Sequence, residues 1–318
     1  MHTTYLSEYG DLVNSPASPR GRLLYATNKG GTWRNEPVTG HFGDGSPYQF
    51  IEHAAVSVDR QGIVHVAFRN SSEVVYGNNR SGTWAFEQLD LAYSFGPEPL
   101  SVSIVLDSDG FAHVAYFAAD PISQPQSARL RYATNRSGAW AVQTLTSIVA
   151  LPGLALQSDL SVALTVADGN KIHLAFLGGN SDVIYASNST GVWAATTIGE
   201  ADPVFIWVQP SLVVQPDGVV HMAFVSLEYI GGTGYYRGVE YASNVSGTWQ
   251  REFVDDQVFL TDTSYSGMRR PSLAVAADGT PHVAYEYFEY ANQFGTLLDE
   301  RLRYARRPGH LWRISDVE

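Results

Sequence analysis

Apolar and polar residues alternate with a period of two in short runs along this chain, and the runs return in the same order. One such pair of runs covers residues 271–276 and 282–285, separated by Asp278-Gly279. Alternation with a period of two is typical of a strand that buries one face, and Asp-Gly between two such runs indicates a tight hairpin. A sustained period of 3.6 residues is not found, so the pattern predicts little helix.

A second repeated signal is a strand followed by a turn that ends in tryptophan, as in Leu130-Arg-Tyr-Ala-Thr-Asn-Arg-Ser-Gly-Ala-Trp140. The six tryptophans of these turns are spaced 51, 56, 53, 56 and 63 residues apart: Trp33, Trp84, Trp140, Trp193, Trp249 and Trp312. Repeats of this length with four short strands each are the blades of a β-propeller. We therefore predict an all-β, six-bladed β-propeller of four-stranded antiparallel blades, as a single domain with blades at about 1–40, 53–91, 99–147, 158–200, 209–255 and 270–318.

The first blade is expected to lack its innermost strand. Residues 1–9 match the pattern of 282–290, which begins at the second strand of its blade. Residues 312–317 complete the fourth strand of the last blade. Two hypotheses follow: the sequence is a fragment of a longer chain with further segments, or the ring closes imperfectly between the first and last blades.

Composition narrows the choice of partners. The net charge is −12 with only two lysines, which argues against nucleic acid, because phosphate binding needs a basic surface. Without cysteine the chain can form neither a disulfide framework nor a cysteine-based zinc site. The sequence has no stretch of about 18 apolar residues, so membrane insertion is not predicted. Residues 1–5 show no apolar signal region.

The Tyr-Ala-x-Asn-x-x-Gly-x-Trp turn, with the upstream Asp-Gly-x-x-His-φ-Ala-aromatic run, resembles the bacterial repeats of the sialidase-like (BNR or Asp-box) propeller superfamily. The sequence departs from that box, since asparagine stands five residues before the tryptophan where the box has aspartate. The resemblance implies a propeller fold and favours an extracellular or cell-surface location. It rests on scaffold residues, so it implies fold and not activity.

Residues that recur in every blade are expected to be structural. A histidine opens the second strand of each blade, where its ring is expected to bond the backbone of a neighbouring blade: His2, His65, His113, His173, His221 and His282. Six copies at equal spacing around a ring lie too far apart to share one ion, so neither a metal site nor a cofactor is predicted. The repeated tyrosines and tryptophans are expected to pack between blade sheets.

Candidate ligand residues therefore come from the segments that differ between blades. The loops between strands two and three and the connections between blades vary in length, and in a propeller both emerge on one face around the central channel. These segments contain aromatic, arginine and carboxylate side chains, which suit the apolar faces and hydroxyls of sugars. The candidates are Tyr48, Tyr93, Trp207, Tyr235, Tyr265, Arg269, Arg270, Glu286 and Tyr287.

The pattern favours a non-catalytic propeller that binds a glycan or a polar small molecule through this variable-loop face. One alternative is a glycoside hydrolase of sialidase-like type, but the family's N-terminal Phe/Tyr-Arg-Ile-Pro motif is not found, and only Arg69, Arg269 and Arg270 are placed near the inner face. Ordinary glycosidases need two carboxylates, and the candidates are Glu52, Asp202, Asp262, Glu286 and Glu289. The other alternative is a structural or protein-interaction module of a larger surface protein.

Overall fold

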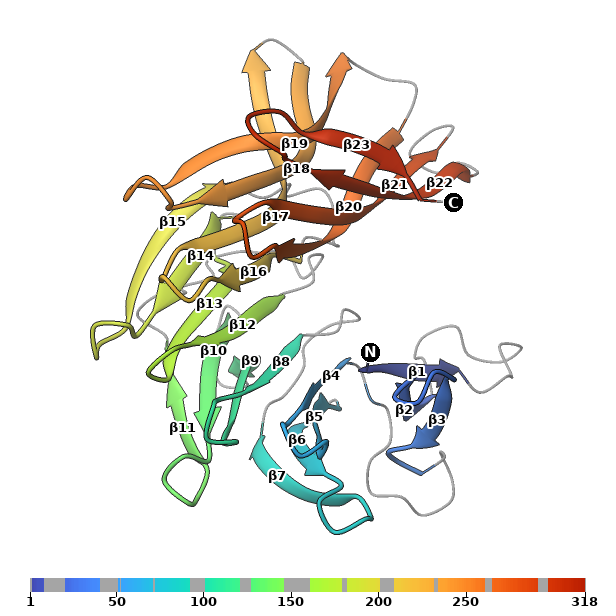
Figure 1. Cartoon of the computed structure of the whole chain (residues 1–318), viewed down its shortest axis with the longest axis vertical. Coiled ribbons are helices and arrows are strands. Elements are labelled where there is room, and N and C mark those ends of the chain that lie inside the picture. The colour runs from blue at the N-terminus through green and yellow to red at the C-terminus, as the bar shows by residue number, and fades with distance from the viewer. Residues whose placement is uncertain are drawn as a thin grey trace. The chain divides into compact units, whose positions relative to one another are not determined.

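The computed structural model describes residues 2–8, 21–40, 51, 53–70, 72–91, 101–120, 127–145, 161–178, 182–200, 209–231, 234–260, 265–290 and 297–317. In this part of the chain every regular element is a β-strand (Figure 1). The chain divides into two compact units, Met1–Leu164 and Thr165–Glu318, and each is described by itself.

The first unit contains three antiparallel sheets in which strands that follow one another in sequence also pair. The first sheet has β1 (His2–Glu8), β2 (Gly21–Thr27) and β3 (Arg34–Pro37). The second has β4 (His53–Val58), β5 (Val64–Arg69), β6 (Glu73–Asn78) and β7 (Ala85–Leu91). The third has β8 (Val102–Leu106), β9 (Ala112–Asp120), β10 (Ser127–Thr134) and β11 (Ala141–Thr144).

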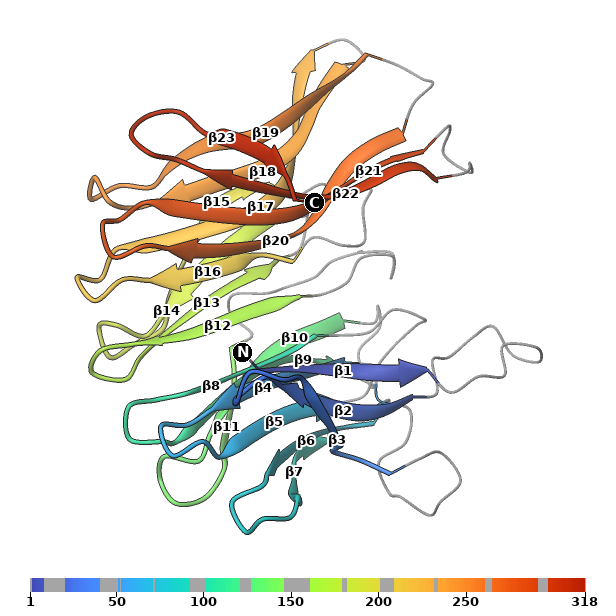
Figure 2. The same cartoon turned by 45° about the vertical axis from the view of Figure 1, so that its right-hand side comes forward.

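The remaining three sheets follow the same order of strands, and the first of their strands begins in the last residues of the first unit. The fourth sheet has β12 (Val162–Ala167), β13 (Lys171–Leu177), β14 (Asp182–Ser187) and β15 (Ala194–Glu200). The fifth has β16 (Ser211–Val214), β17 (Val220–Gly231), β18 (Gly234–Ser243) and β19 (Gln250–Leu260). The sixth has β20 (Tyr265–Val275), β21 (Pro281–Tyr290), β22 (Leu297–Arg306) and β23 (Arg313–Asp316). Figure 2 shows the strands of this sheet from a second side.

The fold prediction is confirmed: the chain is all-β, with six blades of small antiparallel sheets, three strands in the first and four in each of the others. Among the described residues, β1 pairs only with β2, as expected for a first blade without its innermost strand. The organisation as a single domain and the fragment hypothesis stay predictions.

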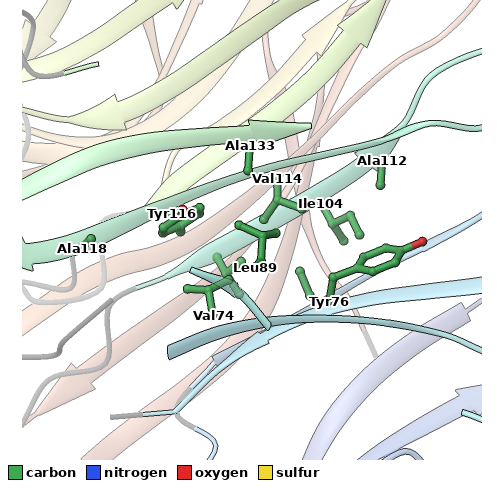
Figure 3. Packing of buried hydrophobic residues seen from close by; sticks show 11 residues of the cluster. Val74, Tyr76, Leu89, Ile104, Ala112, Val114, Tyr116, Ala118 and Ala133 are labelled. Carbon is green, nitrogen blue, oxygen red and sulfur yellow. The ribbon is translucent and has the colours of Figure 1, made fainter. Parts of the chain in front are cut away.

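Apolar side chains from neighbouring sheets meet face to face and form the core. Between the second and third sheets, Val74 and Leu89 pack with Ile104, Val114 and Tyr116, each at most 7% exposed (Figure 3). The alternation seen in the sequence puts one face of each strand into such a layer, and burying a side chain of this size contributes about 1.5–3 kcal/mol. The sheets are thus held mainly by their faces and not by strand pairing between them.

The asparagine of the repeated turn ties the turn to the start of the second strand. The side-chain oxygen of Asn135 accepts a hydrogen bond of 2.8 Å from the N–H of Ala112, and Asn79 does the same with Val64. In the last sheet Pro281 stands at this position and has no N–H, and Arg307 replaces the asparagine. This asparagine latch, present in the second to fifth sheets, is therefore missing from the sixth.

The repeated histidines are structural, but their partner differs from the prediction. Nδ1 of each histidine lies 2.5–2.6 Å from the hydroxyl of a tyrosine in its own sheet. The predicted partner was the backbone of a neighbouring blade. The register explains the pairing, since the histidine opens the second strand and the tyrosine lies near the end of the adjacent third strand. Four of these tyrosines also contact a tryptophan of the next sheet, as Tyr76 does Trp140 with ring centres 5.0 Å apart, which confirms the expected packing of aromatic residues between these sheets: Tyr25, Tyr76, Tyr185 and Tyr241.

Candidate functional site

A bulge at the start of the last sheet gives the candidate site its shape. Arg269 pairs with Glu286 and Ser272 pairs with Ala284, so β20 has one residue more than β21 between these pairs. Arg270 takes up the difference with a φ of 54°, in the left-handed region that non-glycine residues rarely adopt. Such conformations cost roughly 1–3 kcal/mol and occur often at ligand sites, where a bulge re-aims a side chain.

Two arginines and two glutamates come together at this bulge, and we call Arg269, Arg270, Glu286 and Glu300 the Arg–Glu cluster. Arg269 Nε lies 2.5 Å from Glu286 Oε2, and its NH2 lies 2.5 Å from Glu300 Oε1. Arg270 NH1 lies 3.4 Å from Glu286 Oε1. Both oxygens of Glu286 therefore face a guanidinium group.

The members of the cluster differ in exposure. The side chain of Arg269 is 19% exposed and lies over the ring of Phe288, with 5.2 Å between guanidinium carbon and ring centre. Burial acts to lower the pKa of Arg269, but its contacts with Glu286 and Glu300 outweigh burial and raise that pKa. Arg270 and Glu286 are more open, with side chains 44% and 30% exposed. Arg269 thus forms the covered base of the cluster, while Arg270 and Glu286 face outward.

Glu286 occupies a repeat position that is apolar in the third, fourth and fifth blades and is Arg69 in the second. It lies four residues after the blade histidine, where the third, fourth and fifth sheets have Phe117, Leu177 and Val225. Those three side chains are at most 5% exposed. Placing a charged group where the repeat calls for an apolar one costs stability unless the group has partners, and here it has two. Glu286 was predicted as a carboxylate of a segment that differs between blades, and its departure from the apolar repeat is a further signal in the sequence.

Tyr287 lies on the other face of the same strand and is buried. The guanidinium carbon of Arg303 lies 4.0 Å from the centre of its ring. Arg303 in turn reaches Asp255 of the fifth sheet at 2.8 Å, and Asp255 also accepts a hydrogen bond of 2.5 Å from the hydroxyl of Tyr285. Tyr287 therefore contributes to the contact between the fifth and sixth sheets, because successive residues of a strand point to opposite faces.

The other predicted residues are placed only in part. Tyr235 lies in β18, opposite Tyr229 and Phe259 in the register of the sheet, and Tyr265 lies in β20 opposite Tyr290. Tyr48, Tyr93 and Trp207 are outside the described residues, as are the carboxylate candidates Glu52, Asp202 and Asp262. The structure thus brings together Arg269, Arg270 and Glu286 from the predicted set.

Arg69, the remaining inner-face arginine, is fully buried in the first unit. Its NH1 donates a hydrogen bond of 2.7 Å to the carbonyl of Phe117, which ties the second sheet to the third. Burial, with the charge of Arg69, lowers the pKa of the neighbouring His53 to about 4, so this histidine is neutral at pH 7. These contacts give Arg69 a structural role in the described part of the chain.

A repeated group of three polar residues escaped the sequence reasoning. Asp90 accepts hydrogen bonds from the Tyr116 hydroxyl at 2.6 Å and from Arg131 at 2.5 Å, and Asp255, Tyr285 and Arg303 repeat the arrangement in the second unit. We call each set an Asp–Tyr–Arg triad. The signal in the sequence is the pairing of His-Val-Ala-Tyr with Leu-Arg-Tyr-Ala, which occurs only in the third and sixth blades.

Outside the Arg–Glu cluster, the described residues include further candidate metal ligands and carboxyl groups. No group of three or more His, Cys, Asp or Glu side chains there could hold a metal ion. Where the pKa of a described carboxyl is clearly shifted, it is lowered: in Asp59 and Asp107, burial acts to raise it but hydrogen bonds from backbone N–H groups and the neighbouring histidine outweigh burial. A helix long and apolar enough to span a membrane does not occur in the part of the chain that the structure describes.

No protein-family model matches the chain, and no curated protein does. Among solved structures, a triple mutant of AofleA from Arthrobotrys oligospora is 14% identical with a TM-score of 0.51, covering 93% of this chain and 80% of that chain. The fold is a six-bladed β-propeller. A mutant of Aleuria aurantia lectin in complex with alpha-methyl-L-fucoside is 12% identical with a TM-score of 0.50, covering 84% of this propeller and 77% of that chain. A Lactobacillus plantarum protein is also 12% identical with a TM-score of 0.50, covering 100% and 95%. At these identities the likeness shows the fold alone.

Proposed function

We propose that this propeller is a non-catalytic carbohydrate-binding protein and that the Arg–Glu cluster is part of its binding face. The observation that carries the proposal is the exposed Arg270 on a strained bulge beside the partly exposed Glu286, at a position where the third, fourth and fifth blades bury an apolar side chain. Guanidinium groups donate hydrogen bonds and carboxylates accept them, which matches the hydroxyls of a sugar.

The lectin likeness supports this proposal. The Aleuria aurantia structure contains a bound fucoside, so a fold of this kind can present a sugar site. The sialidase-like relationship and an extracellular location, both implied by the repeat motifs, belong to the same proposal. They would place the protein where free glycans are available.

The cluster fits binding better than hydrolysis. A glycosidase needs one carboxyl group that delivers a proton to the leaving oxygen and a second that acts on the other side of the sugar. Both oxygens of Glu286 face guanidinium groups, which only donate hydrogen bonds, and Arg269 also donates to Glu300. The carboxylates of the cluster are thus arranged as hydrogen-bond acceptors.

A glycan array with the purified chain tests the proposal, followed by a hydrolysis assay on every glycan that binds. We expect binding to at least one glycan and no release of sugar. Hydrolysis of a bound glycan would favour the glycosidase alternative. Absence of binding to all glycans would contradict carbohydrate recognition and favour a protein-interaction module.

A further inference from the structure

We infer that Arg270 and Glu286 together recognise two neighbouring hydroxyl groups on a neutral sugar ring, with Arg269 as a positioning residue. This inference rests on the proposed function and adds the class of sugar and the pair of contacting residues.

Arg269 holds the carboxylates in place before any ligand arrives. It bonds Glu286 and Glu300 with two different nitrogens at 2.5 Å each, and its guanidinium is supported by the ring of Phe288. Phe288 is itself 2% exposed, so the base of the cluster is packed. A carboxylate ordered in advance loses less conformational freedom on binding, which favours affinity.

Arg270 and Glu286 present a donor beside an acceptor. The contact between Arg270 NH1 and Glu286 Oε1 is 3.4 Å, longer than the two contacts of Arg269. The left-handed φ of Arg270, followed by Pro271, restricts the backbone that carries this side chain. A hydroxyl both donates and accepts, so one hydroxyl of a neighbouring pair can accept from Arg270 while the other donates to Glu286.

Charge indicates a neutral sugar. The cluster contains two arginines and two glutamates, so its formal charge is zero, and the whole chain carries −12. An acidic sugar would bring its carboxylate next to Glu286 and Glu300, and like charges at this distance repel. This arrangement therefore differs from a clasp of three arginines around a carboxylate, which the sialidase-like resemblance implies for a sialidase.

The opposite face of the same sheet provides a matched control. Arg301 lies 2.5 Å from Asp299 and 2.9 Å from Asp316, with a side chain that is 46% exposed. It is the strand neighbour of Glu300 but pairs in register with Tyr287, whose side chain points away from the cluster. Changing Arg301 removes an exposed ion pair from β22 without touching the Arg–Glu cluster.

The test is isothermal titration of methyl α-L-fucoside, methyl α-D-mannoside, methyl β-D-galactoside and methyl β-D-glucuronide into the full chain. We expect a neutral glycoside to bind and the glucuronide to bind at least about tenfold more weakly. Glu286→Gln and Arg270→Leu should each weaken the neutral glycoside at least about tenfold, since a hydrogen bond to a charged group is lost. Arg301→Ala should stay within about twofold.

Derivatives of the bound glycoside lacking one hydroxyl test the pairing. Loss of either of two neighbouring hydroxyls should weaken binding about tenfold, and loss of a distant hydroxyl should have little effect. Thermal melting of each variant confirms that it is folded, and Arg270→Gly, which relieves the backbone strain, provides a second variant if Arg270→Leu does not fold.

The outcomes separate this inference from the proposed function. If a glycoside binds and Glu286→Gln behaves like Arg301→Ala, the Arg–Glu cluster is not the site, although carbohydrate binding stands. Preferential binding of the glucuronide would overturn the neutral class. If neither the array nor the titrations show binding of any sugar, the proposed function itself is wrong.

Discussion

The contact between the second and third sheets in the first unit and that between the fifth and sixth sheets in the second unit use the same repeat positions. Each has an Asp–Tyr–Arg triad, in which an aspartate of one sheet accepts hydrogen bonds from a tyrosine hydroxyl and an arginine of the next sheet. Burial, together with the neighbouring aspartate, raises the pKa of Tyr116 and of Tyr285 above the usual range. Both tyrosines therefore act as neutral hydrogen-bond donors.

The two contacts differ at the repeat position four residues after the blade histidine. In the first unit Arg69 is fully buried and donates to the Phe117 carbonyl, whereas the fifth sheet has the buried Val225 at the position of Arg69. At the position of Phe117 the sixth sheet has Glu286, whose side chain is partly exposed. Because the triad and the apolar layer hold neighbouring sheets together, the residue at this repeat position can change its role from packing to the presentation of charge.

The largest expected effect comes from removing the buried charge. Arg69→Leu leaves the Phe117 carbonyl without this donor and removes an arginine packed on all sides, so we expect a loss of about 3 kcal/mol in the free energy of unfolding. Urea denaturation measures it. Arg301→Ala, an exposed arginine, is the control and should change stability by less than about 0.5 kcal/mol. Equal effects in the two variants would contradict a structural role for Arg69.

Acid should lower the stability of the first unit through His53. The folded-state pKa of His53 is lowered to about 4, first by burial and then by the charge of Arg69, from 6.5 in the unfolded chain. A lowered histidine pKa contributes stability that is complete above about pH 6.5 and is lost as the pH falls toward 4. Between pH 7 and pH 5 this amounts to about 2 kcal/mol.

Comparison with a His53→Asn variant isolates this contribution from that of the other histidines. The variant should lose about 2 kcal/mol less stability than the natural chain between pH 7 and pH 5, measured by urea denaturation at both values. Identical losses would show that His53 does not titrate in this range.

The two triads should respond unequally to the same substitution. Arg303 also contacts Asp316 at 3.2 Å, so Asp255→Asn leaves it with a carboxylate partner. For Arg131 the further contact is the Leu91 carbonyl at 3.4 Å, so Asp90→Asn removes its ion pair. We expect losses of about 2 kcal/mol for Asp90→Asn and about 1 kcal/mol for Asp255→Asn. The reverse order in denaturation experiments would show that Asp316 does not compensate.

Apart from the control Arg301→Ala, the smallest expected effect on stability is that of Glu286→Gln. The side chain is partly exposed, and glutamine keeps its shape and can still accept a hydrogen bond from Arg269, so the free energy of unfolding should fall by less than about 1 kcal/mol. The affinity for the neutral glycoside should nevertheless fall at least about tenfold. A loss of stability as large as that of Arg69→Leu would make Glu286 a structural residue, like its equivalent Phe117.

The fold was predictable because every level of the sequence repeats. Alternation, Asp-Gly turns and the tryptophan turn recur in register, so each blade supports the assignment of the others. The partner of the blade histidines was not predictable, because the distance from the second strand to the tyrosine of the third depends on the register, which a single sequence does not show.

The candidate site was predictable only in part. Glu286, Arg269 and Arg270 were predicted because they are charged residues in or just before the last blade, in segments that differ between blades. The bulge that brings the arginines to Glu286 depends on one extra residue in β20 and has no reliable sequence signal. Tyr287 looked equivalent to Glu286 in the sequence, but one step along a strand turns its side chain to the other face.

The missing asparagine latch of the last sheet has a consequence for the order of assembly. Latched blades close their own hairpins through contacts between residues near in sequence, so they can form early and locally as the chain emerges. In the last blade the Arg307 N–H still donates to the Pro281 carbonyl, but the Arg307 side chain, at the latch position, lies 2.6 Å from Glu252 of the fifth sheet. We expect the last blade to become protected only once the fifth is in place, which pulsed hydrogen exchange during refolding would reveal as late protection of β21 and β22. The blade that carries the candidate site would then be the last to mature.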